Sequence, residues 1–169
     1  MKYESIDSKL FIKNRLNFSK NMKENGIAFF NSNDIYPVSA DSTLPFEQHR
    51  DIFYLSGIDQ EESVLVLCPN SINPKHREIL FLKETNDHIA VWEGPKINKK
   101  QAYELSGVKS VYWLNDLENI IEELMVNCNN IYINENEHYR AKVETETREA
   151  RFSKWLLNKY PKQNKQRSN

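Results

Sequence analysis

A short run of apolar residues without charge, at positions 27–30, constrains the fold of this chain more than any other feature. A strand with no polar face has to be buried on both sides, as happens when helices cover both faces of a sheet. The segment before it, 7–25, spaces its apolar residues along one helix face, and Gly26 follows as a helix stop. A helix followed at once by a buried strand predicts an α/β fold.

Apolar runs and amphipathic segments alternate through the rest of the chain. The predicted elements are strands at 63–67, 78–82 and 131–133, an apolar run at 108–113, and helices at 99–105, 116–127 and 142–158. The polar stretch between the strands at 63–67 and 78–82 is short enough for an antiparallel connection. Residues 31–45, which contain Ser, Asn, Asp and two prolines, are predicted to form a long loop. We therefore expect an α/β fold with a mixed five- or six-stranded sheet flanked by helices.

Composition limits the domain count and the partners. The chain has 169 residues, of which 39% are hydrophobic, enough to bury one core. Its 23 basic and 24 acidic residues leave a net charge of −1, which gives no electrostatic reason to expect nucleic acid or an anionic membrane as a partner. Neither a signal peptide nor an apolar span of about 20 residues is evident. We expect one domain at 1–160, a basic linker at 161–169 and a cytoplasmic location.

Side chains that could carry chemistry are scattered along the sequence. Cys68 and Cys128 are predicted to be buried small hydrophobes, with no disulfide framework or thiolate metal site indicated. The histidines stand far apart, outside any HExxH spacing, and are predicted to be surface residues: His49, His76, His88 and His138. The four glycines form no nucleotide-binding loop, and a GxSxG motif is absent. The residues alone indicate a binding or structural domain without a complete active site.

Residues 39–57, SADSTLPFEQHRDIFYLSG, closely resemble a signature of the aminopeptidase P amino-terminal domain. In that family a Ser-x-Asp loop leads to Pro-Phe/Tyr-x-Gln-x-x-Asp-Phe-x-Tyr-Leu-x-Gly. Further matching motifs follow in the family's order: ESVLVL at 62–67, ILFL at 79–82, VWEGPK at 91–96 and GV at 107–108. The resemblance covers about residues 10–161 and implies the creatinase amino-terminal domain fold. His49 and Arg50 depart from it, since small polar residues are common at these two positions.

The resemblance implies an Xaa-Pro aminopeptidase, a metallopeptidase that removes the residue ahead of a proline. In the family, a carboxy-terminal pita-bread domain holds two metal ions, usually manganese, through two Asp, two Glu and one His, and those motifs are not found here. We therefore expect a non-catalytic domain that binds no metal itself and is inactive alone. It would shape access for peptides with proline at the second position and support a homodimer or homotetramer.

Four residues are candidates for the substrate cleft or a subunit interface: Asp51, Trp92, Arg50 and His49. The resemblance implies that Asp51 faces the cleft, where its carboxylate could attract a substrate amine; the alternative is a helix N-terminal charge or an internal salt bridge. In family oligomers the equivalent of Trp92 can reach a neighbouring subunit's site, and core packing is the alternative. Two other functions stay open: a peptide- or protein-binding module of a metal-free relative, and a prolidase- or creatinase-type enzyme.

Overall fold

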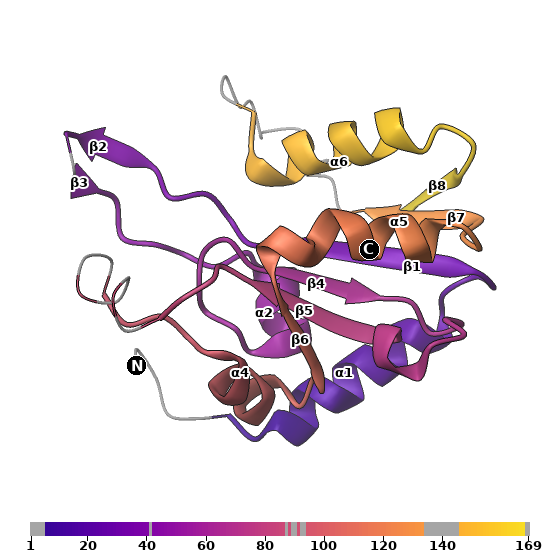
Figure 1. Cartoon of the computed structure of the whole chain (residues 1–169), viewed down its shortest axis with the longest axis horizontal. Coiled ribbons are helices and arrows are strands. Elements are labelled where there is room, and N and C mark those ends of the chain that lie inside the picture. Colours follow the sequence, from indigo (N-terminus) through magenta and orange to yellow (C-terminus); the bar gives the residue numbers. More distant parts are fainter. Residues whose placement is uncertain are drawn as a thin grey trace.

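A six-stranded mixed sheet lies between two layers of helices (Figure 1). The computed structural model describes residues 6–40, 42–86, 88, 91, 94–133 and 146–167. In order across the sheet, the strands are β6 (Ser110–Trp113), β5 (Glu78–Leu82), β4 (Val64–Leu67), β1 (Gly26–Asn31), β7 (Asn130–Ile133) and β8 (Asn164–Arg167). The predicted α/β fold with a mixed sheet is confirmed.

The helices divide between the two faces of this sheet. One face is covered by α1 (Ser8–Lys20), α2 (Arg50–Ser56) and α4 (Lys99–Ser106), and the other by α5 (Leu117–Met125) and α6 (Arg148–Lys159) (Figure 1). Two short 3-10 turns, η1 (Pro74–His76) and η2 (Leu114–Asp116), lie in the connections. None of the described helices is both long enough and apolar enough to cross a bilayer.

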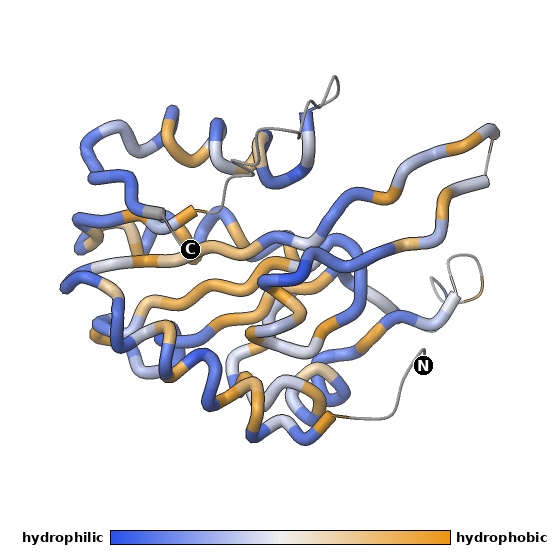
Figure 2. Tube along the Cα trace, turned by 180° about the vertical axis from the view of Figure 1, so that it is seen from behind, coloured by the Kyte–Doolittle hydropathy of each residue, from blue (hydrophilic) through white to orange (hydrophobic). Residues whose placement is uncertain are grey.

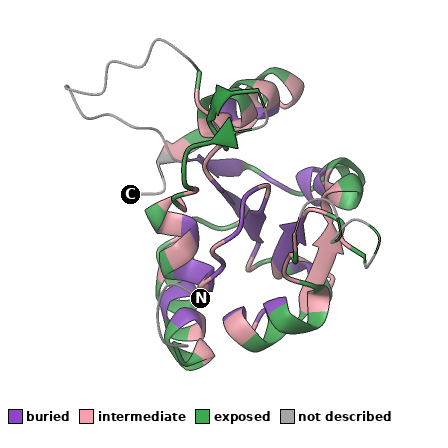
Figure 3. Ribbon diagram, turned by 90° about the vertical axis from the view of Figure 1, so that its left-hand side faces the viewer, coloured by how far each residue is buried: buried purple, intermediate pink, exposed green. Residues whose placement is uncertain are grey.

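Strand β1 shows why the sheet needs helices on both sides. Every residue of β1 is buried. Ile27 and Phe29 belong to the core under α5 and α6, whereas Ala28 and Phe30 belong to the core under α1, α2 and α4. Because successive side chains of a strand point to opposite faces, an uninterrupted apolar run supplies both cores. Figure 2 shows the central strands as the most hydrophobic part of the trace, and Figure 3 shows them buried.

Strand direction follows from the lengths of the connections. Strand β4 is antiparallel to both of its neighbours, β1 and β5, whereas β5–β6, β1–β7 and β7–β8 pair in parallel. The predicted antiparallel connection between 63–67 and 78–82 is therefore confirmed. Strands β5 and β6 are joined through α4, and β7 and β8 through α6, because a parallel crossover needs more chain than a tight turn provides.

Two helices on the same face of the sheet end with the same sequence, Leu-Ser-Gly. Gly57 and Gly107 cap α2 and α4 in the left-handed conformation, with φ of 69° and 73°. In each helix the serine hydroxyl donates to the carbonyl four residues earlier and accepts the amide N–H two residues later. A side chain at either glycine would collide with α1, since a new Cβ would lie 2.3 Å from Phe11 and 2.6 Å from Ile12. The two helix ends are therefore fitted closely against α1.

A fully buried arginine on α1 joins these helix ends. Nη1 of Arg15 donates to the carbonyl oxygens of Leu55, at 2.8 Å, and Ser106, at 3.0 Å. Its Nε donates to the carboxylate of Glu78 at 2.9 Å. A positive charge at two helix C-termini is also favoured by the helix dipoles. Arg15 therefore connects three helices to strand β5.

Several boundaries differ from the sequence predictions. Helix α1 ends at Lys20 with Asn21 as its C-cap, and Gly26 is the first residue of β1 rather than a helix stop. The predicted loop at 31–45 contains an antiparallel pair, β2 (Pro37–Ser39) and β3 (Ser42–Thr43). Helix α6 begins after the N-cap Thr147, and the predicted start near 142 lies outside the described residues.

Part of the predicted linker at 161–169 belongs to the sheet. Residues 164–167 form β8, which pairs in parallel with β7 from Asn130↔Asn164 to Ile133↔Arg167. The backbone makes this ladder at the sheet edge, where one side of the strand faces water and polar side chains are common. Residues 164–167 therefore belong to this sheet, while a domain boundary near 161 and a second domain beyond it stay predictions.

Candidate functional site

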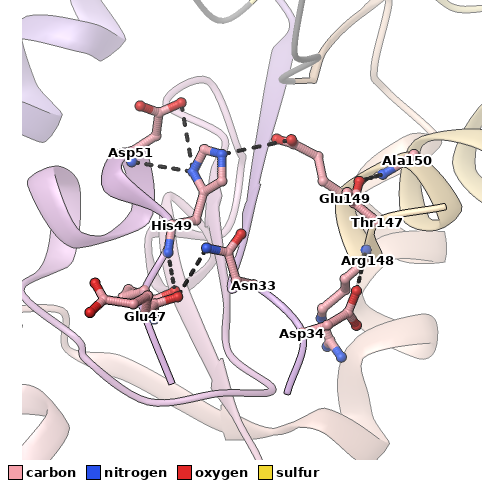
Figure 4. A network of polar contacts seen from close by, with 10 residues as sticks. Asn33, Asp34, Glu47, His49, Asp51, Thr147, Arg148, Glu149 and Ala150 are labelled. Atoms are coloured by element: carbon pink, nitrogen blue, oxygen red, sulfur yellow. Dashed lines mark hydrogen bonds and ion pairs between the residues drawn. The ribbon is translucent and has the colours of Figure 1, made fainter. Parts of the chain in front are cut away.

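Polar side chains from three distant parts of the chain gather beyond the carboxyl end of β1 (Figure 4). The chain leaves β1 through Asn33 and Asp34, and the N-termini of α2 and α6 lie beside this exit. Nδ2 of Asn33 donates to the carbonyl of Glu47 at 2.9 Å, which fixes the chain just before α2. The site is therefore built from helices that lie on opposite faces of the sheet.

His49 links the N-terminus of α2 to that of α6. As the N-cap of α2, its Nδ1 accepts the backbone N–H of Asp51 at 3.3 Å. Its Nε2 faces Oε2 of Glu149 at 3.7 Å. The carboxylate of Asp51 lies 3.9 Å from Nδ1, so the imidazole sits between two acidic groups. The half-buried ring thus joins two helices across the end of the sheet.

Asp34 holds the start of α6 from the other side. Its Oδ2 accepts the backbone N–H of Arg148 at 2.7 Å, and its Oδ1 pairs with Nη2 of Arg151 at 2.7 Å. This hydrogen bond with Asp34 raises the pKa of Arg151. A carboxylate at a helix N-terminus is stabilised by unpaired N–H groups and by the helix dipole. Residues that follow β1 therefore fix the position of α6.

Two buried polar atoms near this site have no partner among the described residues: Nε of Arg148 and Oδ1 of Asn31. Burial lowers the pKa of Arg148, against the opposite effect of the nearby carboxylates of Glu62 and Asp34. Buried polar groups without a hydrogen bond cost free energy. Both atoms therefore add a cost at this end of the sheet.

The β2–β3 pair, with the residues beside it, forms an arm (35–40 and 42–44) that projects from the body of the fold (Figure 1). Figure 3 shows β2 and β3 as exposed. The large apolar side chains of the arm are 42 to 58% exposed: Ile35, Tyr36, Val38 and Leu44. Clustered exposed apolar residues on a projecting element are typical of a contact surface.

The structure brings together two of the four predicted site residues, His49 and Asp51. Asp51 lies in the first turn of α2 with its side chain 45% exposed, as a helix N-terminal charge would. Arg50 opens α2 and is exposed. Trp92 lies outside the described residues. A cleft or interface role for all four stays a prediction.

Sequence reasoning missed the α6 side of this network. Asp34 and Arg151 are separated by 117 positions, so no local pattern connects them. A partial signal existed at Thr147, which accepts the N–H of Ala150 as a helix N-cap. That pattern predicts where a helix starts, but not which residues the helix contacts.

The predictions for histidine and cysteine had mixed outcomes. His76 is 7% exposed, with its ring edge-on to Tyr112 at 6.3 Å and its Nδ1 3.3 Å from Glu123, so its prediction as a surface residue was wrong. His88 is exposed, and His138 lies outside the described residues. Both cysteines are buried, as predicted.

No group of three His, Cys, Asp or Glu side chains in the described ranges could hold a metal ion. His49, Asp51 and Glu149 lie together, but they form a helix-to-helix bridge rather than a ligand set. The family resemblance places its two-metal centre in a carboxy-terminal domain, and that placement stays a prediction.

Comparison with known proteins places the chain in a family. The sequence model of "Aminopeptidase P, N-terminal domain" matches residues 11–132. The chain belongs to this family. Among curated relatives, Xaa-Pro aminopeptidase 3 of Homo sapiens is 29% identical over 103 residues, which cover 60% of this chain and 20% of the relative. The Xaa-Pro aminopeptidase of Escherichia coli K12 is 27% identical over 105 residues, 62% of this chain and 24% of the relative.

Solved structures of the family share the fold. A protein assigned as aminopeptidase P from Bacillus anthracis superposes with a TM-score of 0.83 at 23% identity, covering 96% of this chain and 38% of that one. Aminopeptidase PepP of Pseudomonas aeruginosa superposes with a TM-score of 0.75 at 20% identity, covering 91% and 32%. This aminopeptidase P domain thus spans about a fifth to a quarter of the curated relatives it matches.

Proposed function

We propose that this domain is the amino-terminal part of a manganese-dependent Xaa-Pro aminopeptidase of the cytoplasm, which removes the residue ahead of a proline. The observation that carries the proposal is the family match over 11–132 together with relatives that are named Xaa-Pro aminopeptidases. Since the domain corresponds to 20 to 24% of those relatives, the hydrolytic machinery and its two manganese ions belong to the remaining length. The domain alone is expected to be inactive.

The domain's role is to limit access to the active site and to support a homodimer or homotetramer. Its exposed apolar arm supports this role, because surfaces such as Val38 and Leu44 gain stability when another surface covers them. The bridge between His49 and Glu149 supports it as well, since it holds helices on both sides of the sheet at the base of the arm. In the assembled enzyme, Asp51 would attract the amino group of a peptide with proline second, and Trp92 would line the path.

An experiment on the arm tests this role in the complete enzyme. Val38→Asp combined with Leu44→Asp places charge on the arm, and Ile72→Asp places the same charge on another exposed apolar residue, 86% exposed, outside the arm. Light scattering should show a smaller assembly for the arm variant alone. Its kcat/KM for long Xaa-Pro peptides should also rise relative to that for short ones. An unchanged mass and unchanged length preference would refute the role in access and assembly.

The same arm would suit a second candidate, a metal-free protein-binding module, because exposed apolar side chains also serve protein partners. The two candidates differ in chemistry, since only the enzyme releases the first residue of an Xaa-Pro peptide. Hydrolysis by the complete protein therefore separates them, and an inactive complete protein would favour the module.

A further inference from the structure

The two cysteines, 60 positions apart in sequence, lie on the same face of the sheet. Cys68 follows Leu67, which pairs with Ala28, so the antiparallel register places Cys68 opposite Ile27. The thiol of Cys128 donates to the carbonyl of Asn130 at 3.3 Å and is also hydrogen-bonded by the backbone of Ile27. Both cysteines belong to the core cluster under α5 and α6. The fold therefore brings both thiols beside one residue of β1.

The two thiols also interact electrostatically. Burial, followed by charge repulsion from Cys68, raises the pKa of Cys128 to about 11. Neither thiol forms a disulfide.

Both thiols also line one pocket of about 260 Å³. Its walls are the loop between β4 and β5 and the end of α5, and its lining includes the side chains of Asn25, Ser71, Ile72, Glu123 and Asn127. Ile72 is 86% exposed, so the pocket reaches the surface. A small hydrated ion could therefore reach the thiols without opening the core.

The surroundings decide which class of ion fits. Zinc and iron in thiolate sites usually take four protein ligands, and the described residues contain no group of even three. Thiolates alone suit soft ions, of which copper(I) is the biological example. We propose that Cys68 and Cys128 together bind one copper(I) ion in this pocket, a site that does not depend on the proposed peptidase function.

Binding at this site is an exchange of protons for a cation. Each thiol releases its proton to solvent, and each sulfur forms one bond to the ion, so two protons leave for each copper(I) that enters. No electron is transferred, because copper stays in the +1 state. The asparagines that line the pocket would take no part in bonding, since soft ions prefer sulfur over amide oxygen.

Copper(I) competition in the absence of oxygen tests the proposal. The 169-residue chain is titrated into copper(I) bicinchoninate, and the loss of the coloured complex measures transfer to the protein. Wild type should take up one ion per chain. Cys68→Ser and Cys128→Ser should each weaken binding by more than about 100-fold, since even residues outside the ligand shell change metal affinity by 10- to 100-fold. Ser71→Ala, which alters the same pocket without removing sulfur, should bind as wild type does.

Several outcomes would overturn the proposal. Failure of the wild type to compete for the ion would overturn it. Wild-type affinity in either serine variant would also overturn it, because the ion would then need only one thiol. X-ray absorption of the copper-loaded wild type gives a second measurement, free of any effect of mutation on folding. It should show two sulfur neighbours, and a nitrogen or oxygen neighbour in place of either sulfur would refute the site.

Discussion

Replacing Arg15 by methionine tests what holds α2 and α4 against α1. Methionine keeps the apolar stem but donates no hydrogen bond, so the carbonyls of Leu55 and Ser106 lose a donor inside the core. Each buried group left unpaired costs about 1–3 kcal/mol. Glu78 loses its partner too, at a smaller cost because its side chain is 30% exposed. Methionine also removes the buried Nη2, which has no partner among the described residues, and this offsets part of the loss.

The expected net loss for Arg15→Met is about 3 kcal/mol of the free energy of unfolding, near the lower end of the range for breaking a buried ion pair. Urea denaturation measures it from the transition midpoint and slope. Lys13→Met is the matched control, because Lys13 lies on the same helix and is exposed, and it should change stability by no more than about 0.5 kcal/mol. A loss below about 1 kcal/mol for Arg15→Met would refute the reasoning, since the bonds would then only balance the cost of burying the charge.

Gly57→Ala should destabilise the domain more than Gly94→Ala. Both glycines have positive φ, 69° and 78°, at a cost to alanine of about 1–2 kcal/mol, but a new Cβ meets a ring atom at 2.3 Å only at Gly57. Equal losses in urea denaturation would contradict this account. His49→Ala should cost about 1 kcal/mol through the lost N-cap, and His49→Asn should recover most of it because asparagine caps well; two variants of equal stability would show that the cap contributes little. Burial raises the pKa of the Cys68 and Cys128 thiols from 9.0 to about 11, so their contribution to stability should be present below about pH 9 and lost as the pH rises toward about 11. In that window the unfolded thiols ionise before the folded ones, and a double serine variant should lack this part of the pH dependence in urea midpoints.

The parts of the fold that could be predicted from sequence are those set by local patterns. The apolar run at 27–30 predicted a strand buried on both faces, because no polar face was available. Gly107 marked the end of α4 correctly, because a left-handed C-cap favours glycine. Gly26 gave the same signal and was wrong. Glycine is needed there because the backbone of Lys23 packs closely against it. An added Cβ at Gly26 would lie 2.8 Å from the carbonyl oxygen of Lys23.

The parts that could not be predicted depend on contacts between distant segments. Strand β8 is polar, and its place in the sheet is set by backbone pairing with β7 rather than by its side chains. His76 is buried beside Tyr112 and Glu123, and neither lies near it in sequence. The contact between His49 and Glu149 could not be predicted for the same reason. The motif at 39–57 contains His49 and Asp51, whereas Glu149 comes from the opposite face of the sheet.

Hydrolysis of a short Xaa-Pro peptide with added manganese is the measurement that tests the central claim most directly. The 169-residue domain would be compared with the product of the complete reading frame that encodes it. The account predicts release of the first residue by the complete protein and none by the domain alone. Release by the isolated domain would contradict its non-catalytic role, and an inactive complete protein would contradict its assignment to an aminopeptidase.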